Sequence, residues 1–410
     1  MAGAGSSCGA PPVAATHDRA GAGVSAAAWR LLGAALVSQI GVSVVEQGIP
    51  TLTGFVKSDL GLSAAAAGGT VAAFTVGRVL GSYAAGVAAD RVGERRVLVA
   101  GGVATGVVVA AAVSFPLGLL ITALVLAGMT SAASTPAGGR LVLLAFPRNR
   151  RGFALGVRQT GVPVGGLVAA ALLPVLAHAY GWRWSLAVAG TITAASVLPL
   201  MLSKSERVEE LPVRTDSWSP LRDRTVLLLA LWGCLLVSGQ YALVAFFALD
   251  LHHRAGFALA TASLLLAVSQ AFGIVGRVAW GGLSDRLLRR GRKPLLVLLT
   301  VVAILAALLL FALPRSLPAG AWVAVAALAG FALIGFQGLW VTMIAEAAGP
   351  GRAGAATGFG ITFVAAGIAA SPPLYGLVAD LTGTYRSIWA ALAVVLTAAL
   401  VPAAFVHERR

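Results

Sequence analysis

Long apolar segments alternate with short polar ones along almost the whole chain. A helix needs about 20 apolar residues to cross the hydrocarbon core of a bilayer. Twelve segments of suitable length lie at residues 30–55, 66–88, 97–115, 117–139, 153–177, 184–202, 225–249, 258–281, 295–313, 320–345, 355–379 and 386–406. The pattern therefore predicts an all-α membrane protein with 12 transmembrane helices.

A polar stretch separates the first six segments from the last six. It carries clustered charges and two prolines, Pro212 and Pro220. The N-terminal tail is rich in Ala, Gly and Ser and lacks the early basic region of a cleavable signal, so we expect it to be disordered. The expected domains are a disordered tail at 1–28, a six-helix bundle at 29–203, a linker at 204–224, a second six-helix bundle at 225–406 and a short tail at 407–410.

The composition supports lipid as the main solvent of the chain. Hydrophobic residues make up 58% of the 410 residues and charged residues 11%. Soluble domains have about 45–50% and about 25%. A soluble protein of this size has too little interior to cover so much apolar surface.

The basic residues indicate the topology. A net charge of +15 would suggest nucleic-acid binding in a soluble protein. If the N-terminus is cytoplasmic, however, most Lys and Arg residues fall in the two tails and in the loops on that side. The opposite loops hold only Lys57, Arg183, Arg254, Arg315 and Arg386. The positive-inside rule then places both termini and the linker in the cytoplasm, in a cell-membrane protein without a nucleic-acid partner.

One turn occurs twice, about half a chain length apart. Residues 86–91 read Gly-x-x-x-Asp-Arg where the second apolar segment ends, and residues 281–286 read the same where the eighth ends. A basic run follows each turn. Glycines also recur in both halves at one common offset: Gly152, Gly165 and Gly181 match Gly354, Gly367 and Gly383. This ordered set indicates a duplicated membrane protein.

The repeated turn resembles the loop between the second and third helices of the major facilitator superfamily, and its echo between the eighth and ninth. The resemblance implies two pseudo-symmetric six-helix bundles and transport by alternating access. It also implies a conformational latch, because an Asp at a helix end can accept from free N–H groups of a neighbouring helix and pair with Arg. The implied latch residues are Gly86, Asp90, Arg91, Gly93, Arg95 and Arg96, with Asp285 and Arg286 as the weaker copy. The alternative is a solvated basic loop.

Four arginines lie inside apolar segments, where a charge costs at least about 2.5–3.5 kcal/mol unless it faces a cavity or a partner. We expect Arg78, Arg158 and Arg277 to face one central cavity, where guanidinium groups bind anions bidentately. Gly276-Arg277 also resembles organic-anion and monocarboxylate carriers. The alternative for each arginine is to reach the membrane surface or to pair with a helix end, and for Arg140 we favour that alternative.

Other polar residues are candidates for the same cavity. Glu46 is the sole carboxylate deep in the first half, and we expect it either to bind a coupling proton or to lie in an outer vestibule. Amides and aromatic rings suit a small ligand, although each of them can also bridge helices. The expected lining residues are Gln159, Gln270, Tyr241, Gln337 and Trp340.

Several activities lack their sequence signals. Cys8 and Cys234 are too far apart to suggest a disulfide framework or a metal cluster. The chain has no phosphate-binding loop or hydrolase motif, so we expect neither an enzyme nor a bound cofactor. Residues 161–166 resemble an element of drug/proton antiporters, but Pro163 is displaced by one position and Leu124 stands where the antiporters have Arg.

These patterns predict a monomeric secondary transporter of a small solute. The favoured function is a proton-coupled carrier of small organic or inorganic anions, with protons and the lipid bilayer as its other partners. A proton-driven exporter of amphipathic drugs is the alternative. A receptor or scaffold without transport is a third possibility if the cavity is sealed.

Overall fold

Helices account for the regular structure of the described chain. The computed structural model describes residues 24–62, 64–203, 222–287, 291–314 and 317–408. Within these ranges it has 12 helical spans long and apolar enough to cross a membrane, and it has no strand. The prediction of an all-α, 12-helix membrane protein is confirmed. Most of the expected N-terminal tail and of the linker at 204–224 lies outside the described residues.

Nine α-helices form the six spans of the first half. They are α1 (Ala26–Asp59), α2 (Ala64–Val92), α3 (Glu94–Ala111), α4 (Leu117–Ser131), α5 (Ser134–Ala145), α6 (Arg151–Gln159), α7 (Gly161–Tyr180), α8 (Trp182–Ala195) and α9 (Leu198–Leu202). The pairs α4/α5, α6/α7 and α8/α9 each follow one another within a single span.

Seven α-helices form the six spans of the second half. They are α11 (Arg224–Ala255), α12 (Leu259–Arg286), α13 (Lys293–Ala312), α14 (Ala319–Leu333), α15 (Gln337–Ala348), α16 (Ala353–Thr382) and α17 (Arg386–Phe405). Here only α14 and α15 share a span. The break between them corresponds to the break between α4 and α5 in the first half.

A polar side chain caps the first helix of each half. Ser25 caps α1 by accepting from the Ala28 amide at 3.1 Å, and Asp223 caps α11 by accepting from the Thr225 amide at 2.9 Å. Each half therefore begins with a capped helix.

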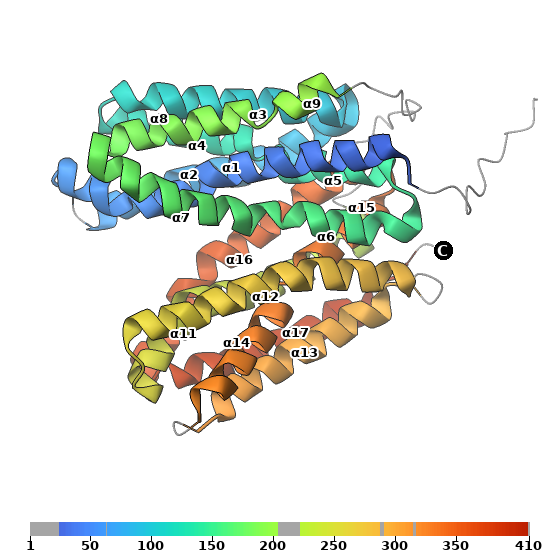
Figure 1. Cartoon of the computed structure of the whole chain (residues 1–410). Helices are drawn as coiled ribbons and strands as arrows, with labels where there is room; N and C mark the ends of the chain where they lie inside the picture. The colour runs from blue at the N-terminus through green and yellow to red at the C-terminus, as the bar shows by residue number, and fades with distance from the viewer. Residues whose placement is uncertain (1–23, 63, 204–221, 288–290, 315–316, 409–410) are drawn as a thin grey trace, which may run out of the picture.

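The two halves form two bundles that meet along two helix pairs (Figure 1). In the first pair α16 packs along α2, and in the second α12 packs along α6. The bundles lie close together at the end that holds α5, α6 and α15, on the right of Figure 1, and diverge toward the other end. Each pair joins the second span of one half to the fifth span of the other half, so the fold is pseudo-symmetric.

Candidate transport site and latches

The first latch joins the end of α2 to the start of α16. Asp90 accepts from the backbone amides of Gly354 at 3.0 Å and Ala355 at 2.7 Å. The first amides of a helix have no partner within the helix, and they lie at the positive end of its dipole. A single carboxylate thus satisfies two of these donors and holds the two bundles together.

The second latch repeats this arrangement with the halves exchanged. Asp285, at the end of α12, accepts from the amides of Gly152 at 2.9 Å and Phe153 at 2.7 Å. These amides belong to the first turn of α6. The structure therefore brings both predicted aspartates into equivalent contacts, although the sequence did not identify their partners.

Glycine contacts set how closely the helices of each latch approach. A Cβ on Gly86 would overlap the carbonyl oxygen of Gly354, and a Cβ on Gly281 would overlap that of Gly152. Gly86 and Gly281 of the repeated turn therefore contact Gly354 and Gly152, two of the glycines that recur in both halves of the chain. Their lack of a side chain lets each aspartate reach the opposing helix.

Buried ion pairs support both aspartates. Arg140, on α5, lies 3.0 Å from Asp90 and also pairs with Glu94 at the start of α3. Arg140 is 6% exposed, so of the two parts of the alternative expected for it, reaching the surface or pairing at a helix end, the structure shows the second. No pattern in the sequence pointed to Glu94 as its partner.

The second latch uses the opposite charges at the corresponding places. Arg292, which precedes α13, lies 3.0 Å from Asp285 and 3.1 Å from Glu346 on α15. Neither Arg292 nor Glu346 was predicted as a site residue. Glu346 is the single carboxylate between residues 320 and 348, and that isolation was the signal that could have identified it.

The structure does not bring the predicted basic residues of the loops into the latches. Arg95 donates to the carbonyl oxygens of Met201 at 3.0 Å and Ser203 at 2.5 Å, so it holds the end of α9. The other three are exposed: Arg91, Arg96 and Arg286. Gly93 adopts a φ of 103°, which lets the chain turn sharply between α2 and α3.

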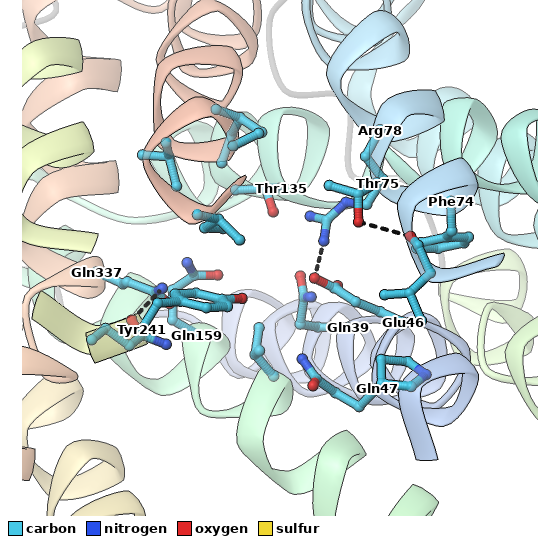
Figure 2. A pocket seen from close by; sticks show the side chains of 18 of the residues that line it. Gln39, Glu46, Gln47, Phe74, Thr75, Arg78, Thr135, Gln159, Tyr241 and Gln337 are labelled. Carbon is cyan, nitrogen blue, oxygen red and sulfur yellow. Dashed lines mark hydrogen bonds and ion pairs between the residues drawn. The ribbon is translucent and has the colours of Figure 1, made fainter. Parts of the chain in front are cut away.

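A cavity of about 360 Å³ lies between the bundles (Figure 2). Both halves contribute to its wall. The lining residues are Gln39, Glu46, Gln47, Ile49, Pro50, Val71, Phe74, Thr75, Arg78, Thr135, Gln159, Val162, Gln240, Tyr241, Phe336, Gln337, Trp340, Ile361, Val364, Ala365 and Ile368.

One ion pair is exposed to this cavity. Arg78 on α2 donates to the carboxylate of Glu46 on α1, and their side chains are 21% and 18% exposed. Figure 2 shows the pair at the edge of the open space, with Tyr241 pointing into the same space from α11. The predicted arginine and the predicted proton site are thus in direct contact.

Arg158 lies behind the cavity wall. Its side chain is fully buried and donates to the amide oxygen of Gln39 at 2.8 Å and to the carbonyl oxygen of Ser134 at 2.5 Å. A longer bond of 3.4 Å reaches the amide oxygen of Gln159. Ser134 begins α5, so Arg158 binds the broken region of the fourth span.

Arg277 is also buried and bridges the two bundles. It donates to the backbone carbonyl oxygen of Gln159 at 3.0 Å and, at 3.4 Å, to that of Ile334. These carbonyl groups lie where α6 and α14 end. The expectation that three arginines face one cavity is therefore met in this conformation by Arg78 alone. Neither Arg158 nor Arg277 forms an ion pair with a carboxylate of the described residues.

Four of the five predicted neutral residues line the cavity. Gln159, Tyr241, Gln337 and Trp340 do so, whereas Gln270 does not. The Trp340 indole N–H donates to the Leu229 carbonyl oxygen at 2.8 Å, so the indole N–H is already satisfied.

A comparison with protein families identifies the class of protein that this architecture represents. The family model described as "Major Facilitator Superfamily" matches residues 20–372, which is most of the chain. The chain belongs to this superfamily, as the repeated turn suggested. It is an integral membrane transporter and not an enzyme.

Curated relatives agree with this assignment. The chain is 34% identical over 330 residues to "Uncharacterized MFS-type transporter Rv2994" of Mycobacterium tuberculosis, covering 77% of this chain and 71% of that protein. It is 28% identical over 358 residues to "Hexuronate transporter" of Bacillus subtilis, covering 81% and 83%.

Solved structures share the fold at lower identity. The transporter FucP, described in the outward conformation, superposes with a TM-score of 0.73 at 16% identity, covering 92% of this chain and 98% of that one. A variant described as the E. coli fucose:proton symporter gives a TM-score of 0.71 at 17% identity. These likenesses establish the fold.

Proposed function

We propose that this transporter is a proton-coupled carrier of small organic or inorganic anions. We place it in the cell membrane, with its latches and termini in the cytoplasm. The observation that carries the proposal is the charge distribution around the cavity. Arg78 faces the cavity, and two further guanidinium groups, which pair with no carboxylate in the described part of the chain, lie just behind its wall.

One buried arginine orients amide groups of the cavity wall. A guanidinium group has donors but no acceptor, so the amide oxygens of Gln39 and Gln159 turn toward Arg158. The Gln39 amide nitrogen in turn donates to the Ser43 hydroxyl group at 3.3 Å. A positive charge buried behind the wall favours an anion in the cavity and disfavours a cation.

The pair of Glu46 and Arg78 provides a route for proton coupling. While Glu46 is ionised, it occupies the guanidinium group of Arg78. Protonation of Glu46 removes this competition, and an anionic substrate can then take its place on Arg78. Proton binding and anion binding thus favour each other. The relatives are compatible with this, since one is named a hexuronate transporter and FucP is described as a fucose:proton symporter.

We assign the conformation to the outward-facing part of the transport cycle. The closed latches hold the bundles together at one end, and the cavity lies between the bundles where they diverge. The inward-facing state then requires α16 to leave Asp90 and α6 to leave Asp285.

Transport by the purified protein in liposomes tests the proposal. An imposed pH gradient, acidic outside, is expected to drive uptake of labelled small carboxylates. The Arg78→Gln variant is expected to lose at least about tenfold of this uptake, since a charge-assisted bidentate contact is lost. Arg96→Gln removes an exposed arginine at the latch end and serves as the matched control. Uptake that is equal in the two variants would contradict the role of Arg78.

The coupling step is tested by Glu46→Gln. This variant keeps Arg78 free at every pH, so we expect counterflow exchange of the anion to persist while uptake no longer responds to the pH gradient. A variant that still concentrates the anion in response to the gradient would exclude Glu46 as the proton site.

A proton-driven exporter of amphipathic drugs is the second candidate. It is favoured by the carboxylate of Glu46 and by the apolar part of the cavity wall, which together suit an amphipathic cation. Export of cationic dyes that survives Arg78→Gln, with no anion uptake by the unmodified protein, would replace the first proposal with this one.

A further inference from the structure

We infer that the transported anion has one charged end and an apolar body about 10 Å long, which lies along α16. The inference rests on the proposed function and narrows the substrate class. It predicts an amphipathic monocarboxylate, such as an arylacetate, in preference to a sugar acid, a dicarboxylate or an inorganic anion.

The wall contributed by α16 is entirely apolar. Its lining residues are Ile361, Val364, Ala365 and Ile368. Their spacing of three, one and three residues places them on one face of a helix. With a rise of about 1.5 Å per residue, this face is roughly 10 Å long. The polar lining residues belong to other helices.

The packing of α16 on α2 locates this face relative to Arg78. The two helices run antiparallel from the latch, with Gly86 against Gly354 and Ser82 against Gly358. A further step of four residues along α2 reaches Arg78, which is then level with the start of the apolar face. The α2 residues beyond Arg78 that line the cavity are Val71, Phe74 and Thr75. The charged end of the ligand therefore lies deep, and the apolar face of α16 continues from that level away from the latches.

The position of Arg78 at one end of the apolar α16 face favours some anions over others. Those hydroxyl groups of a sugar acid that face α16 would be buried without partners, and each such group costs binding free energy. A second carboxylate would meet the same apolar wall, since Arg78 is the one guanidinium group that lines the cavity in the described part of the chain. A small inorganic anion would leave the apolar wall unfilled and would gain nothing from it.

Binding to the full-length protein in lipid nanodiscs tests the inference without the passive membrane permeation of weak acids. Isothermal titration at acidic pH would compare phenylacetate, glucuronate and phenylethylamine. We expect phenylacetate to bind at least about tenfold more tightly than glucuronate, because the sugar acid leaves hydroxyl groups unpaired. Phenylethylamine is expected to show no measurable binding.

Substitutions on α16 test the same point from the protein side. Val364→Thr and Ala365→Ser place a hydroxyl group in the wall with little change in volume, and we expect each to weaken phenylacetate binding about three- to tenfold. The matched controls, Val394→Thr on α17 and Ala366→Ser on α16, alter exposed residues and are expected to leave it unchanged.

The outcomes separate the apolar-body inference from the anion transport on which it rests. Glucuronate binding as tight as that of phenylacetate, or equal effects of wall and control variants, would overturn the apolar-body inference and leave anion transport standing. Binding of phenylethylamine alone, or of no probe, would overturn the proposed function together with the inference.

Discussion

The two latches use the same backbone contacts but opposite supporting charges. In each latch an aspartate accepts from the first two amides of a helix of the other bundle, across a contact between two glycines. In the first, the cation is on α5 and the acid begins α3; in the second, the acid is on α15 and the cation precedes α13. The comparison indicates that the duplication preserved the backbone geometry, whereas the sign of each supporting charge was free to change as long as the pair remained.

Removing the cation is expected to have the largest effect on either latch. Arg140→Gln leaves two carboxylates close together, as does Arg292→Gln, and breaking one side of a buried pair costs about 3–5 kcal/mol. We expect both variants to shift the protein toward latch-open states and to lower its thermal stability in detergent. The loss is expected to be similar in the two latches despite the reversed positions.

Thermal unfolding and labelling with a membrane-impermeant thiol reagent measure this effect. Ser284→Cys supplies a buried reporter in the second latch, and Arg96→Gln is the control for loss of an exposed arginine. A loss of thermal stability in only one of the two arginine variants would show that the position of the charge matters, and would contradict the equivalence of the two latches.

Widening the glycine contacts is expected to have an intermediate effect. Gly281→Val forces a side chain onto the carbonyl oxygen of Gly152, and overpacking of this kind costs about 1–3 kcal/mol. That corresponds to a roughly 5- to 150-fold shift in the latch equilibrium. Labelling and anion uptake would both report it. In Gly282→Val, the matched control, the new Cβ would make an ordinary contact of 3.5 Å with Phe153. Equal effects of the two variants would contradict the proposed tight contact.

Neutralising the acidic partners is expected to have the smallest effect. Glu94 and Glu346 are partly exposed, at 17% and 13% of their side chains, so the surrounding solvent weakens their ion pairs. We expect Glu94→Gln and Glu346→Gln to change stability by no more than about 1 kcal/mol. A change in thermal stability as large as that of the arginine variants would show that these acids are as important to the latch as the arginines.

The sequence predicted the helices more reliably than it predicted what each side chain contacts. Apolar length alone gives the 12 spans, since a helix must cross a fixed thickness of lipid. Arg158 lies inside the fifth helical span, as its position in the apolar segment predicted. That position does not determine which way the side chain points, and Arg158 points into its own bundle.

The same limit applies to the latches and to the cavity wall. The matched glycines signalled a duplication, but the contact between Gly86 and Gly354 depends on how the two bundles dock. The apolar face at Ile361 and Ile368 has the helical spacing of any lipid-facing or core-facing surface. Only the three-dimensional arrangement places it on the cavity.

The continuity of α16 links the two ends of this interface mechanically. Its counterpart in the first half is divided at Thr160 into α6 and α7, whereas α16 runs unbroken from Ala353 to Thr382. The residues that meet Asp90 and those that line the cavity therefore belong to one helix, and the nearest of them, Ala355 and Ile361, are separated by less than two helical turns. If the protein works as proposed, a solute that tilts this helix from the cavity would also change the angle at which its first amides meet Asp90. Occupancy of the cavity would then be conveyed to the latch through a single helix.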